Sequence, residues 1–176
     1  MKNNNIKNKL SKYFNKEILD NIDFSEINKN KDLISSIFEK IHNKEERKKY
    51  AQFFTHKELV NFILSHIPIK KTDFILDPAC GAGAFLIEAY EKVSLNNIYG
   101  IDIDKKALDL CSINLENKVG KSSLNLIQAN TLKSNLRSLF PKIAEQGGFD
   151  IVIGNPPFQN LLKNIDYNEE KIYTKV

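Results

Sequence analysis

The sequence contains few cysteines and histidines, and its apolar runs are short. Two cysteines, Cys80 and Cys111, and three histidines are scattered along 176 residues, and no pair has the spacing of metal ligands. We therefore expect no metal site, and a reducing compartment would keep both thiols free. The longest apolar stretches, residues 59–69 and 82–90, fall well short of the roughly 20 residues that a membrane-spanning helix needs. We therefore expect no membrane-spanning helix.

Charge and the amino terminus narrow the expected location and partners. Residues 1–14 carry positive charge but lack the apolar segment and cleavage site of a secretory signal, so we expect a cytoplasmic protein. The net charge of +4 and the pI near 8.9 would suit a polyanion such as DNA. Lys is, however, mixed with Asp and Glu along the chain, and abundant Lys, Asn and Ile are also expected of an AT-rich genome. The charge alone gives limited support to DNA binding.

The chain divides by composition into an extension and a domain. Residues 1–48 are polar and rich in Lys and Asn, and one helical face stands out within them: Leu33, Ile34, Ile37, Phe38 and Ile41. We predict a helical extension over 1–48 and a globular domain over 49–176. A further helix is predicted to begin at Thr55, where Thr55 and Glu58 have the spacing of a capping box, and to end at Pro68.

From residue 74 onward, short apolar runs alternate with helical patterns. We predict strands at 74–77, 98–101, 124–127 and 149–153, and helices at 84–93, at 105–116 and in a segment that stops before Pro141. Nearly continuous apolar strands linked by helices indicate a parallel sheet covered on both faces. The predicted fold class is α/β, a doubly wound sheet of about four strands with N-terminal helices. Ligands are expected at the carboxyl ends of the strands.

The loop after the first predicted strand, residues 77–85, contains Gly81 and Gly83 and opens a helix. Glycines allow a ligand to approach the backbone, and a helix N-terminus offers free N–H groups. A nicotinamide fingerprint would need a third glycine three residues after Gly83, where Leu86 stands. The NAD alternative is therefore weakened.

Two further loops carry polar residues after buried strands. Asp102 follows the second strand, where a carboxylate can accept hydrogen bonds from both ribose hydroxyls of an adenosine. The alternative is an ordinary helix cap by Asp102 or Asp104. After the fourth strand comes Asn155-Pro156-Pro157-Phe158, in which two prolines can hold the Asn amide and the Pro156 carbonyl toward one point. A plain proline-rich turn is the alternative there.

Taken together, the loops resemble a known family. The segments DPACGAGAFL, YGIDID, QAN and NPPF are, in this order, similar to the cofactor and catalytic motifs of amino-methyltransferases. Gln52-Phe53-Phe54-Thr55 resembles the additional cofactor motif of the adenine-N6 enzymes of type I and type IIG restriction-modification systems. Two departures are His56, where relatives have Pro, and Asn130, where many have Asp. The resemblance covers about residues 50–160.

This resemblance implies a Rossmann-like fold that binds S-adenosylmethionine and methylates adenine N6 in double-stranded DNA. By similarity, Thr55 contacts the methionine end of the cofactor, Asp102 the ribose and Asn130 the adenine. The cofactor is lined by Asp77, Ala79, Gly81 and Gly83. Asn155 and Pro156 accept the two N6 hydrogens, Pro157 keeps the loop rigid, and Phe158 stacks on a flipped base.

The resemblance also implies that parts of such an enzyme are absent. Only 18 residues follow Phe158, too few for the remaining strands of a seven-stranded sheet and a domain that reads DNA sequence. We therefore expect a truncated or split form that acts with a complementing polypeptide, and an exposed fourth strand. The alternatives are a non-catalytic remnant that only binds cofactor, and a methyltransferase of protein glutamine or RNA. Those relatives usually have Tyr in place of Phe158 and lack the Thr55 motif.

Overall fold

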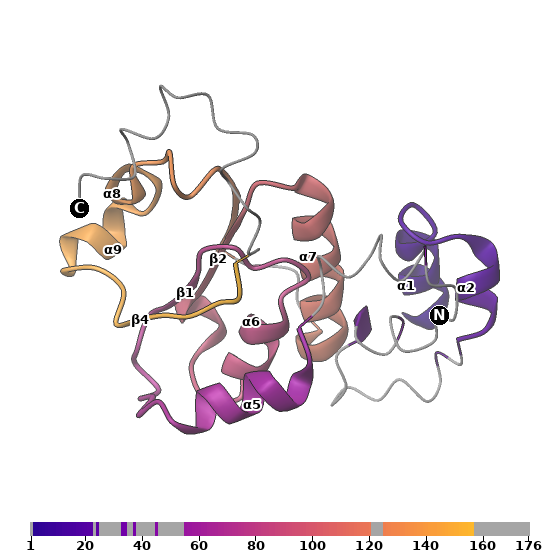
Figure 1. Cartoon of the computed structure of the whole chain (residues 1–176), viewed down its shortest axis with the longest axis horizontal. Helices are drawn as coiled ribbons and strands as arrows, with labels where there is room; N and C mark the ends of the chain where they lie inside the picture. Colours follow the sequence, from indigo (N-terminus) through magenta and orange to yellow (C-terminus); the bar gives the residue numbers. More distant parts are fainter. Residues whose placement is uncertain are drawn as a thin grey trace.

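A computed structural model describes residues 2–22, 24, 33–34, 37, 45, 55–120 and 125–156. Within them lies one four-stranded sheet in the order β3-β2-β1-β4 (Figure 1). Its strands are β1 (Ile75–Asp77), β2 (Ile98–Asp102), β3 (Asn125–Gln128) and β4 (Ile151–Val152). All pairings are parallel, which confirms the predicted sheet. β4 is shorter than the predicted strand at 149–153.

The strand order places a topological switch beside β1. Ile75 of β1 pairs with Ile98 of β2 on one side and with Ile151 of β4 on the other. The chain therefore adds β2 and β3 in one direction and then returns to the opposite side of β1 for β4. Because all four strands are parallel, their carboxyl ends lie at one edge of the sheet, where ligands bind in such folds.

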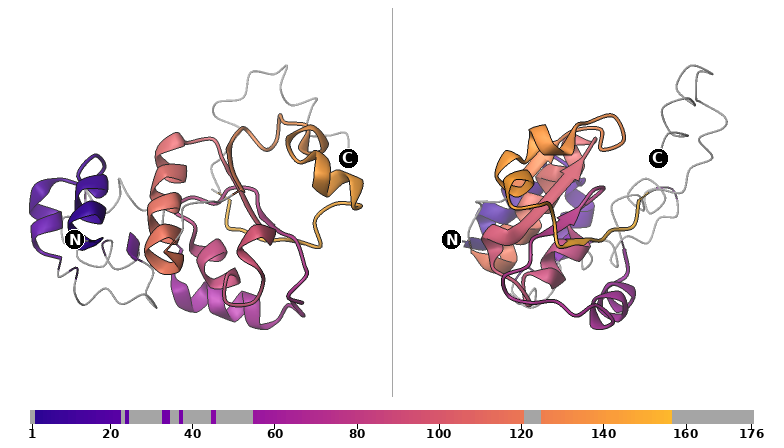
Figure 2. Two further views of the ribbon diagram at one scale, coloured as in Figure 1. Left: turned by 180° about the vertical axis from the view of Figure 1, so that it is seen from behind. Right: turned by 90° about the vertical axis from the view of Figure 1, so that its left-hand side faces the viewer.

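Helices cover both faces of the sheet. One apolar core contains residues of α5 (Lys57–Ser65), α6 (Ala84–Ala89) and α7 (Lys105–Val119) together with Ile75 and Ile98. A second core joins the opposite face to α8 (Leu136–Leu139) and α9 (Pro141–Glu145), which lie apart from the other helices in Figure 2. Successive strand residues point to opposite faces. This explains why Leu76 and Ile101 belong to the second core.

Aromatic rings dominate the second core. The ring centroid of Tyr99 lies 5.4 Å from that of Phe140 and 5.2 Å from that of Phe149. The centroids of Phe140 and Phe149 are 5.2 Å apart, and all three pairs are arranged edge to face. Such edge-to-face pairs add stabilisation of about 0.5–1.5 kcal/mol beyond the buried area. They anchor the segment before β4 to β2. A 3₁₀ turn (Leu95–Asn97) leads directly into β2.

Both predicted boundaries of α5 are wrong, whereas the predicted helix end before Pro141 is confirmed, since α8 ends at Leu139. The helix α5 begins at Lys57 and its N-cap is His56, whose side chain makes no capping hydrogen bond, so Thr55 does not open the helix in a capping box. It also ends at Ser65, ahead of Pro68. Pro141 does not only stop a helix: it is the first residue of α9, where its missing N–H would have no helical partner in any case.

The N-terminal residues form helices that pack on the domain. Figure 1 shows α1 (Lys2–Leu10) and α2 (Lys16–Asp20) beside α7, on the side away from α8 and α9. Of the predicted apolar face at residues 33–41, Leu33, Ile34 and Ile37 are buried, while Phe38 and Ile41 lie outside the described residues. The described part of the extension therefore shares a core with the domain.

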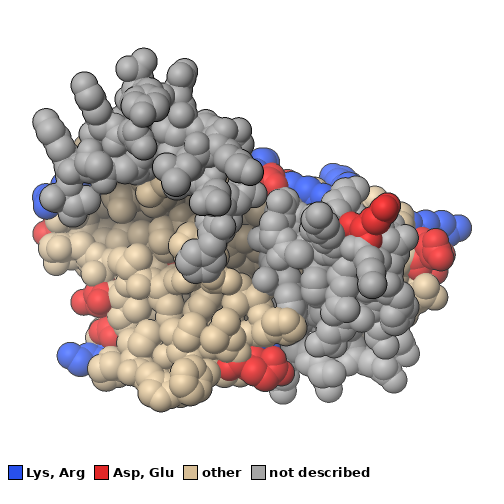
Figure 3. Space-filling model, in the orientation of Figure 1, with Lys and Arg blue, Asp and Glu red and all other residues tan. Residues whose placement is uncertain are grey.

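Charged side chains do not gather into one patch on the described part of the face in Figure 3. On the face in Figure 3, described Lys and Arg side chains lie at the edges, several beside acidic ones, and a wide area carries neither charge. None of the described helices is both long and apolar enough to span a membrane. On β4, at the edge of the described sheet, Val152 is 62% exposed.

Candidate active site

The glycine loop, defined as residues 77–83, follows β1 and is held by β2. Cys80 N donates to Ile101 O over 2.9 Å, and Gly81 N donates to Asp102 Oδ2 over 2.9 Å. Gly83 caps α6 with a φ of 88°, and a Cβ atom there would lie 2.5 Å from Cys111 Sγ. Only glycine fits this position without strain. The loop thus has a defined backbone conformation that depends on its neighbours.

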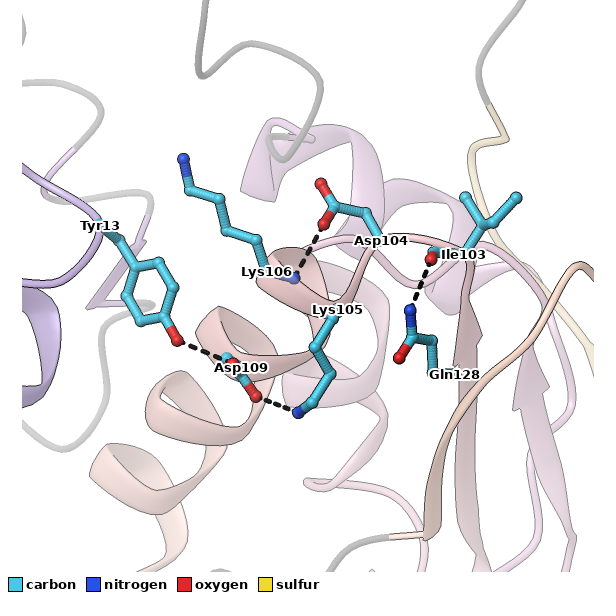
Figure 4. A network of polar contacts seen from close by, with 7 residues as sticks. All are labelled: Tyr13, Ile103, Asp104, Lys105, Lys106, Asp109 and Gln128. Atoms are coloured by element: carbon cyan, nitrogen blue, oxygen red, sulfur yellow. Dashed lines mark hydrogen bonds and ion pairs between the residues drawn. The ribbon is translucent and has the colours of Figure 1, made fainter.

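Asp102 orients the glycine loop, and a different residue caps the following helix. Besides Gly81 N, the Asp102 carboxylate accepts from Asp104 N through Oδ1 over 2.9 Å. Asp104 is the N-cap of α7, since its own carboxylate accepts from Lys106 N over 2.8 Å (Figure 4). The cap is therefore Asp104. Each Asp102 oxygen keeps a second lone pair for another donor.

The loop after β3 is joined to the glycine loop. Thr131 Oγ1 donates to Pro78 O over 2.5 Å. Asn130 Oδ1 accepts from Leu132 N over 3.1 Å, so this amide oxygen already has one local partner and keeps one lone pair. Thr131 was not among the predicted site residues. Its position directly after Asn130, the predicted adenine contact, is the sequence feature that could have identified it.

Two apolar side chains stand exposed at the same edge. Ile103 follows Asp102 and is 65% exposed, and Leu132 follows the Asn130 turn and is 60% exposed. Gln128 Nε2 donates to Ile103 O over 3.2 Å, which joins the end of β3 to the Asp102 loop (Figure 4). Neither apolar residue was among the predicted site residues, which were chosen for their polar groups. No feature of the sequence marks these two aliphatic residues as exposed.

The loop after β4 approaches Asp77. Ile153 N donates to Leu76 O over 2.9 Å, and a side chain on Gly154 would overlap Asp77 Oδ1. The next residue, Asn155, therefore lies close to the glycine loop, and both it and Pro156 are exposed. Pro157 and Phe158 lie outside the described residues. The structure thus brings together the loops that follow all four strands.

Asp77 is a buried carboxylate at the centre of this arrangement. It is 1% exposed, and its Oδ1 accepts from Ala79 N over 3.1 Å. Burial raises the pKa of Asp77 to about 7, the negative charge of Asp102 adds to the shift, and the Ala79 hydrogen bond opposes it. The charge of this group therefore changes near neutral pH.

The two cysteines pack beneath the glycine loop. Both are buried, and a hydrogen bond with Cys111 together with burial raises the pKa of Cys80. Cys80 therefore stays a neutral thiol and serves packing. Across the residues that the structure describes, no cluster of His, Cys, Asp or Glu could hold a metal ion.

Thr55 stands apart from the four loops in sequence. It is half-buried and precedes His56, the N-cap of α5, and α5 packs against α6, the helix that the glycine loop opens. Gln52, Phe53 and Phe54 of the same motif lie outside the described residues. The roles assigned to Thr55 and to the loop residues remain predictions.

Known proteins match most of this chain. It is 31% identical over 162 residues to the type I restriction enzyme MjaVII methylase subunit of Methanocaldococcus jannaschii, a match that covers 87% of the chain and 26% of the relative. It is 30% identical over 118 residues to the MpnII methylase subunit of Mycoplasma pneumoniae, covering 61% of the chain and 22% of the relative. The chain thus spans about a quarter of these relatives.

Shorter matches reach other methyltransferases. An rRNA N(6)-adenosine-methyltransferase of Caenorhabditis elegans is 36% identical over 84 residues, and a release factor glutamine methyltransferase of Fusobacterium nucleatum is 35% identical over 85. Each match covers 48% of this chain.

The fold is also found in a solved structure. A modification subunit assigned to a type I restriction enzyme of Vibrio vulnificus YJ016 superposes with a TM-score of 0.55 at 21% identity, over 85% of this chain and 34% of that one. Residues 29–176 match the family described as N-6 DNA Methylase. The chain therefore belongs to the N-6 DNA methylase family.

Proposed function

We propose that this chain binds S-adenosylmethionine at the carboxyl ends of its strands and presents Asn155 and Pro156 to an adenine in double-stranded DNA. The observation that carries the proposal is the approach of Gly154 to Asp77. It puts the start of the Asn-Pro-Pro-Phe segment against the glycine loop. A methyl donor and its acceptor must meet in line within one site, which such an arrangement supports.

The residues at the edge fit the cofactor chemically. A nucleoside needs acceptors for its ribose hydroxyls, and the remaining lone pairs of Asp102 can serve there. Its base needs apolar cover, which the exposed Ile103 and Leu132 can provide from two adjacent loops, with the Asn130 amide at its edge. The methionine end carries positive charge, which an ionised Asp77 would favour and Thr55 could contact.

When bound, S-adenosylmethionine supplies an electrophilic methyl group. The task of the protein is then to make the adenine N6 lone pair available, because conjugation with the ring otherwise delocalises it. Asn155 Oδ1 and the Pro156 carbonyl would each accept one N6 hydrogen and draw the amino group toward tetrahedral geometry. No strong base is required for this step, because the methylated nitrogen becomes acidic and releases one proton to water, while S-adenosylhomocysteine is the leaving group. The adenine must leave the duplex stack to reach these groups, and Phe158 would stack on it.

The further strands and the DNA-reading domain of a complete enzyme would lie outside these 176 residues. Relatives several times longer than this chain have room for more strands and for a domain that reads DNA sequence. We infer that a complementing polypeptide, or a continuation of the same one, pairs with β4 beside the exposed Val152. We also infer a cytoplasmic location, where bacterial DNA is found.

The alternatives are a chain that only binds cofactor and a methyltransferase that acts on RNA or on protein glutamine. The chain could bind the cofactor without turnover, because it spans only about a quarter of the length of its methylase relatives. The matches to an rRNA and a release factor methyltransferase keep RNA and protein glutamine as alternative substrates. The motif at Thr55 and the match over residues 29–176 favour DNA adenine.

One assay separates these functions. The full chain, alone and with the rest of its modification enzyme, is incubated with S-adenosylmethionine labelled in the methyl group and with adenine-containing DNA, rRNA or release factor. We expect label in N6-methyladenine of DNA. Label only in RNA or protein would replace the proposed substrate. Calorimetric binding of cofactor without transfer in any sample would identify a binding module.

A further inference from the structure

A buried amide on α7 connects the N-terminal extension to the glycine loop. Asn114 is 1% exposed. Its Oδ1 accepts from Leu33 N over 2.8 Å and from Ile34 N over 3.4 Å, and its Nδ2 donates to Ala82 O over 3.1 Å. Ala82 lies between Gly81 and Gly83. A single side chain thus contacts both the extension and the C-terminal part of the glycine loop.

The extension packs on the same two elements. Ala82 shares an apolar core with three α7 residues, Ala107, Leu110 and Ile113. The rest of this core comes from the extension: Ile6, Leu10, Phe14, Ile18, Leu19, Ile22, Leu33, Ile34 and Ile37. Ala82 is therefore buried between α7 and the extension rather than against the sheet. Displacing the extension would expose one side of the glycine loop to water.

Polar contacts at the rim of this core fix the extension against α7. Tyr13 Oη donates to Asp109 Oδ2 over 2.7 Å (Figure 4), and Lys9 Nζ lies 2.7 Å from Glu116 Oε2. Asp109 also pairs with Lys105. These contacts flank Asn114 along α7 but do not touch the glycine loop. They hold the extension without a direct link to the cofactor loop.

The glycine loop needs such a link because glycine adds no side-chain packing of its own. β2 holds the loop through Cys80 N and Gly81 N. The carbonyl of Ala82, the residue that follows Gly81, is bonded to Asn114 instead. Without this amide, the Ala82 carbonyl and the Leu33 N–H would be left buried without these partners, which native structures avoid.

We propose that Asn114 is a positioning residue through which the docked extension holds the glycine loop in the conformation that binds cofactor. This inference rests on the proposed function of that loop. Docking of the extension then raises cofactor affinity, and cofactor binding must stabilise docking to the same degree. The extension is on this view a determinant of cofactor affinity, although none of its described residues is assigned to the cofactor site.

The test compares two variants of the full chain. In Asn114→Asp one oxygen still accepts from Leu33 N, while the other faces the Ala82 carbonyl and repels it, so the change acts on the loop side. Tyr13→Phe, the control, removes a hydroxyl from the same interface and leaves Asn114 intact. Calorimetry with S-adenosylhomocysteine should show about tenfold weaker binding for Asn114→Asp. Tyr13→Phe should keep the wild-type affinity.

Hydrogen exchange gives a readout that needs no ligand. The amides of Gly81, Ala82 and Gly83 should exchange faster in Asn114→Asp than in wild type or Tyr13→Phe, while the α7 amides stay protected. In the wild-type chain, S-adenosylhomocysteine should slow exchange at the Leu33 and Ile34 amides. This last measurement needs no variant, so a failure of Asn114→Asp to fold does not remove the test.

Three results would overturn the inference. They are wild-type affinity in a folded Asn114→Asp chain, an equal loss of affinity in Tyr13→Phe, and exchange at Leu33 and Ile34 that does not respond to bound ligand. If wild type itself does not bind S-adenosylhomocysteine, the proposed function fails. The coupling is then decided separately, by whether the glycine loop exchanges faster in the ligand-free Asn114→Asp chain.

Discussion

The loops after β1 and β4 meet at Asp77 and Gly154 but differ in how they are held. The glycine loop is tied to β2 through Asp102 and to α7 through Asn114, and its carboxylate Asp77 is 1% exposed. In the loop after β4, Asn155 and Pro156 are exposed, and the strand that carries them pairs only with β1 among the described residues. The loop assigned to the cofactor is rigidly supported, whereas the loop assigned to the target base is open.

This difference predicts that binding and methyl transfer can be separated by mutation. Groups on a rigid scaffold keep their geometry before the ligand arrives, which favours binding. Groups on an exposed loop can act only when the substrate reaches them. Changes to the glycine loop should therefore affect affinity or stability, and changes after β4 should affect the rate.

The largest effect is expected for Asn155→Ala. Loss of a positioned acceptor at the reacting group should lower methyl transfer to DNA by about 10²–10³-fold. The affinity for S-adenosylhomocysteine should not change. Methyl transfer is measured by label incorporation into DNA by the enzyme that contains this chain, and cofactor affinity is measured by calorimetry. Asn61→Ala on the exposed side of α5 is the matched control. A parallel loss of binding and transfer would show that Asn155 supports the fold of the site instead.

The next effect is expected for Asp102→Ala. It removes the charged acceptor assigned to the ribose and the partner of Gly81 N, so cofactor affinity should fall about 10–100-fold. Asp104→Ala, two residues away, is the control: it removes the cap of α7 and should cost about 1 kcal/mol of stability without changing affinity. If both variants bind equally poorly, α7 rather than the Asp102 carboxylate determines binding.

A smaller effect concerns pH. The pKa of Asp77 is raised from 3.8 to about 7 in the folded chain, so between these values the folded protein keeps a proton that the unfolded chain has lost. The free energy of unfolding should therefore fall as pH rises from about 4 to about 7, by about 1 kcal/mol per pH unit from this group. Urea unfolding of wild type and Asp77→Asn at pH 5, 6 and 7 measures this. Parallel pH profiles would exclude a raised pKa.

The smallest effect compares two glycines with left-handed backbone. Gly83 has a φ of 88° and Gly120 a φ of 77°, but only at Gly83 would a Cβ atom meet another atom within 4 Å, Cys111 Sγ. Gly83→Ala should therefore be about 1 kcal/mol more destabilising than Gly120→Ala, the excess being overpacking. Thermal unfolding measures both. In a Cys111→Ala background the difference should vanish, and its persistence would assign it to the backbone.

Local patterns predicted most of the fold. Alternating apolar runs and helical stripes gave β1 to β4 and α5 to α7 to within a few residues, because these periodicities depend only on near neighbours. Boundaries were less accurate. Thr55 has the sequence of a cap, yet the helix begins after His56, and Pro141, expected only as a stop, opens α9. Both sequences fit either position, and packing selects one.

The sequence predicted which residues form the candidate site better than it predicted what surrounds them. The order of the motifs indicated Asp77, Asp102, Asn130 and Asn155, and the parallel sheet then required their loops to share one edge. The exposure of Ile103 and Leu132 was not predictable, because an aliphatic residue in a loop is as often covered as open. Their role depends on which segments lie around them.

By itself, the amino-acid sequence determined the alternation of strands and helices, the glycine turn before α6 and the family. Only the tertiary structure decided that Gly154 closes on Asp77, that Asp104 rather than Asp102 caps α7, and that Asn114 joins the extension to Ala82. The physical reason is the separation along the chain of the residues that interact. Turn and helix preferences act over a few neighbouring residues, whereas these contacts join segments far apart in the chain that meet only when the apolar cores are packed.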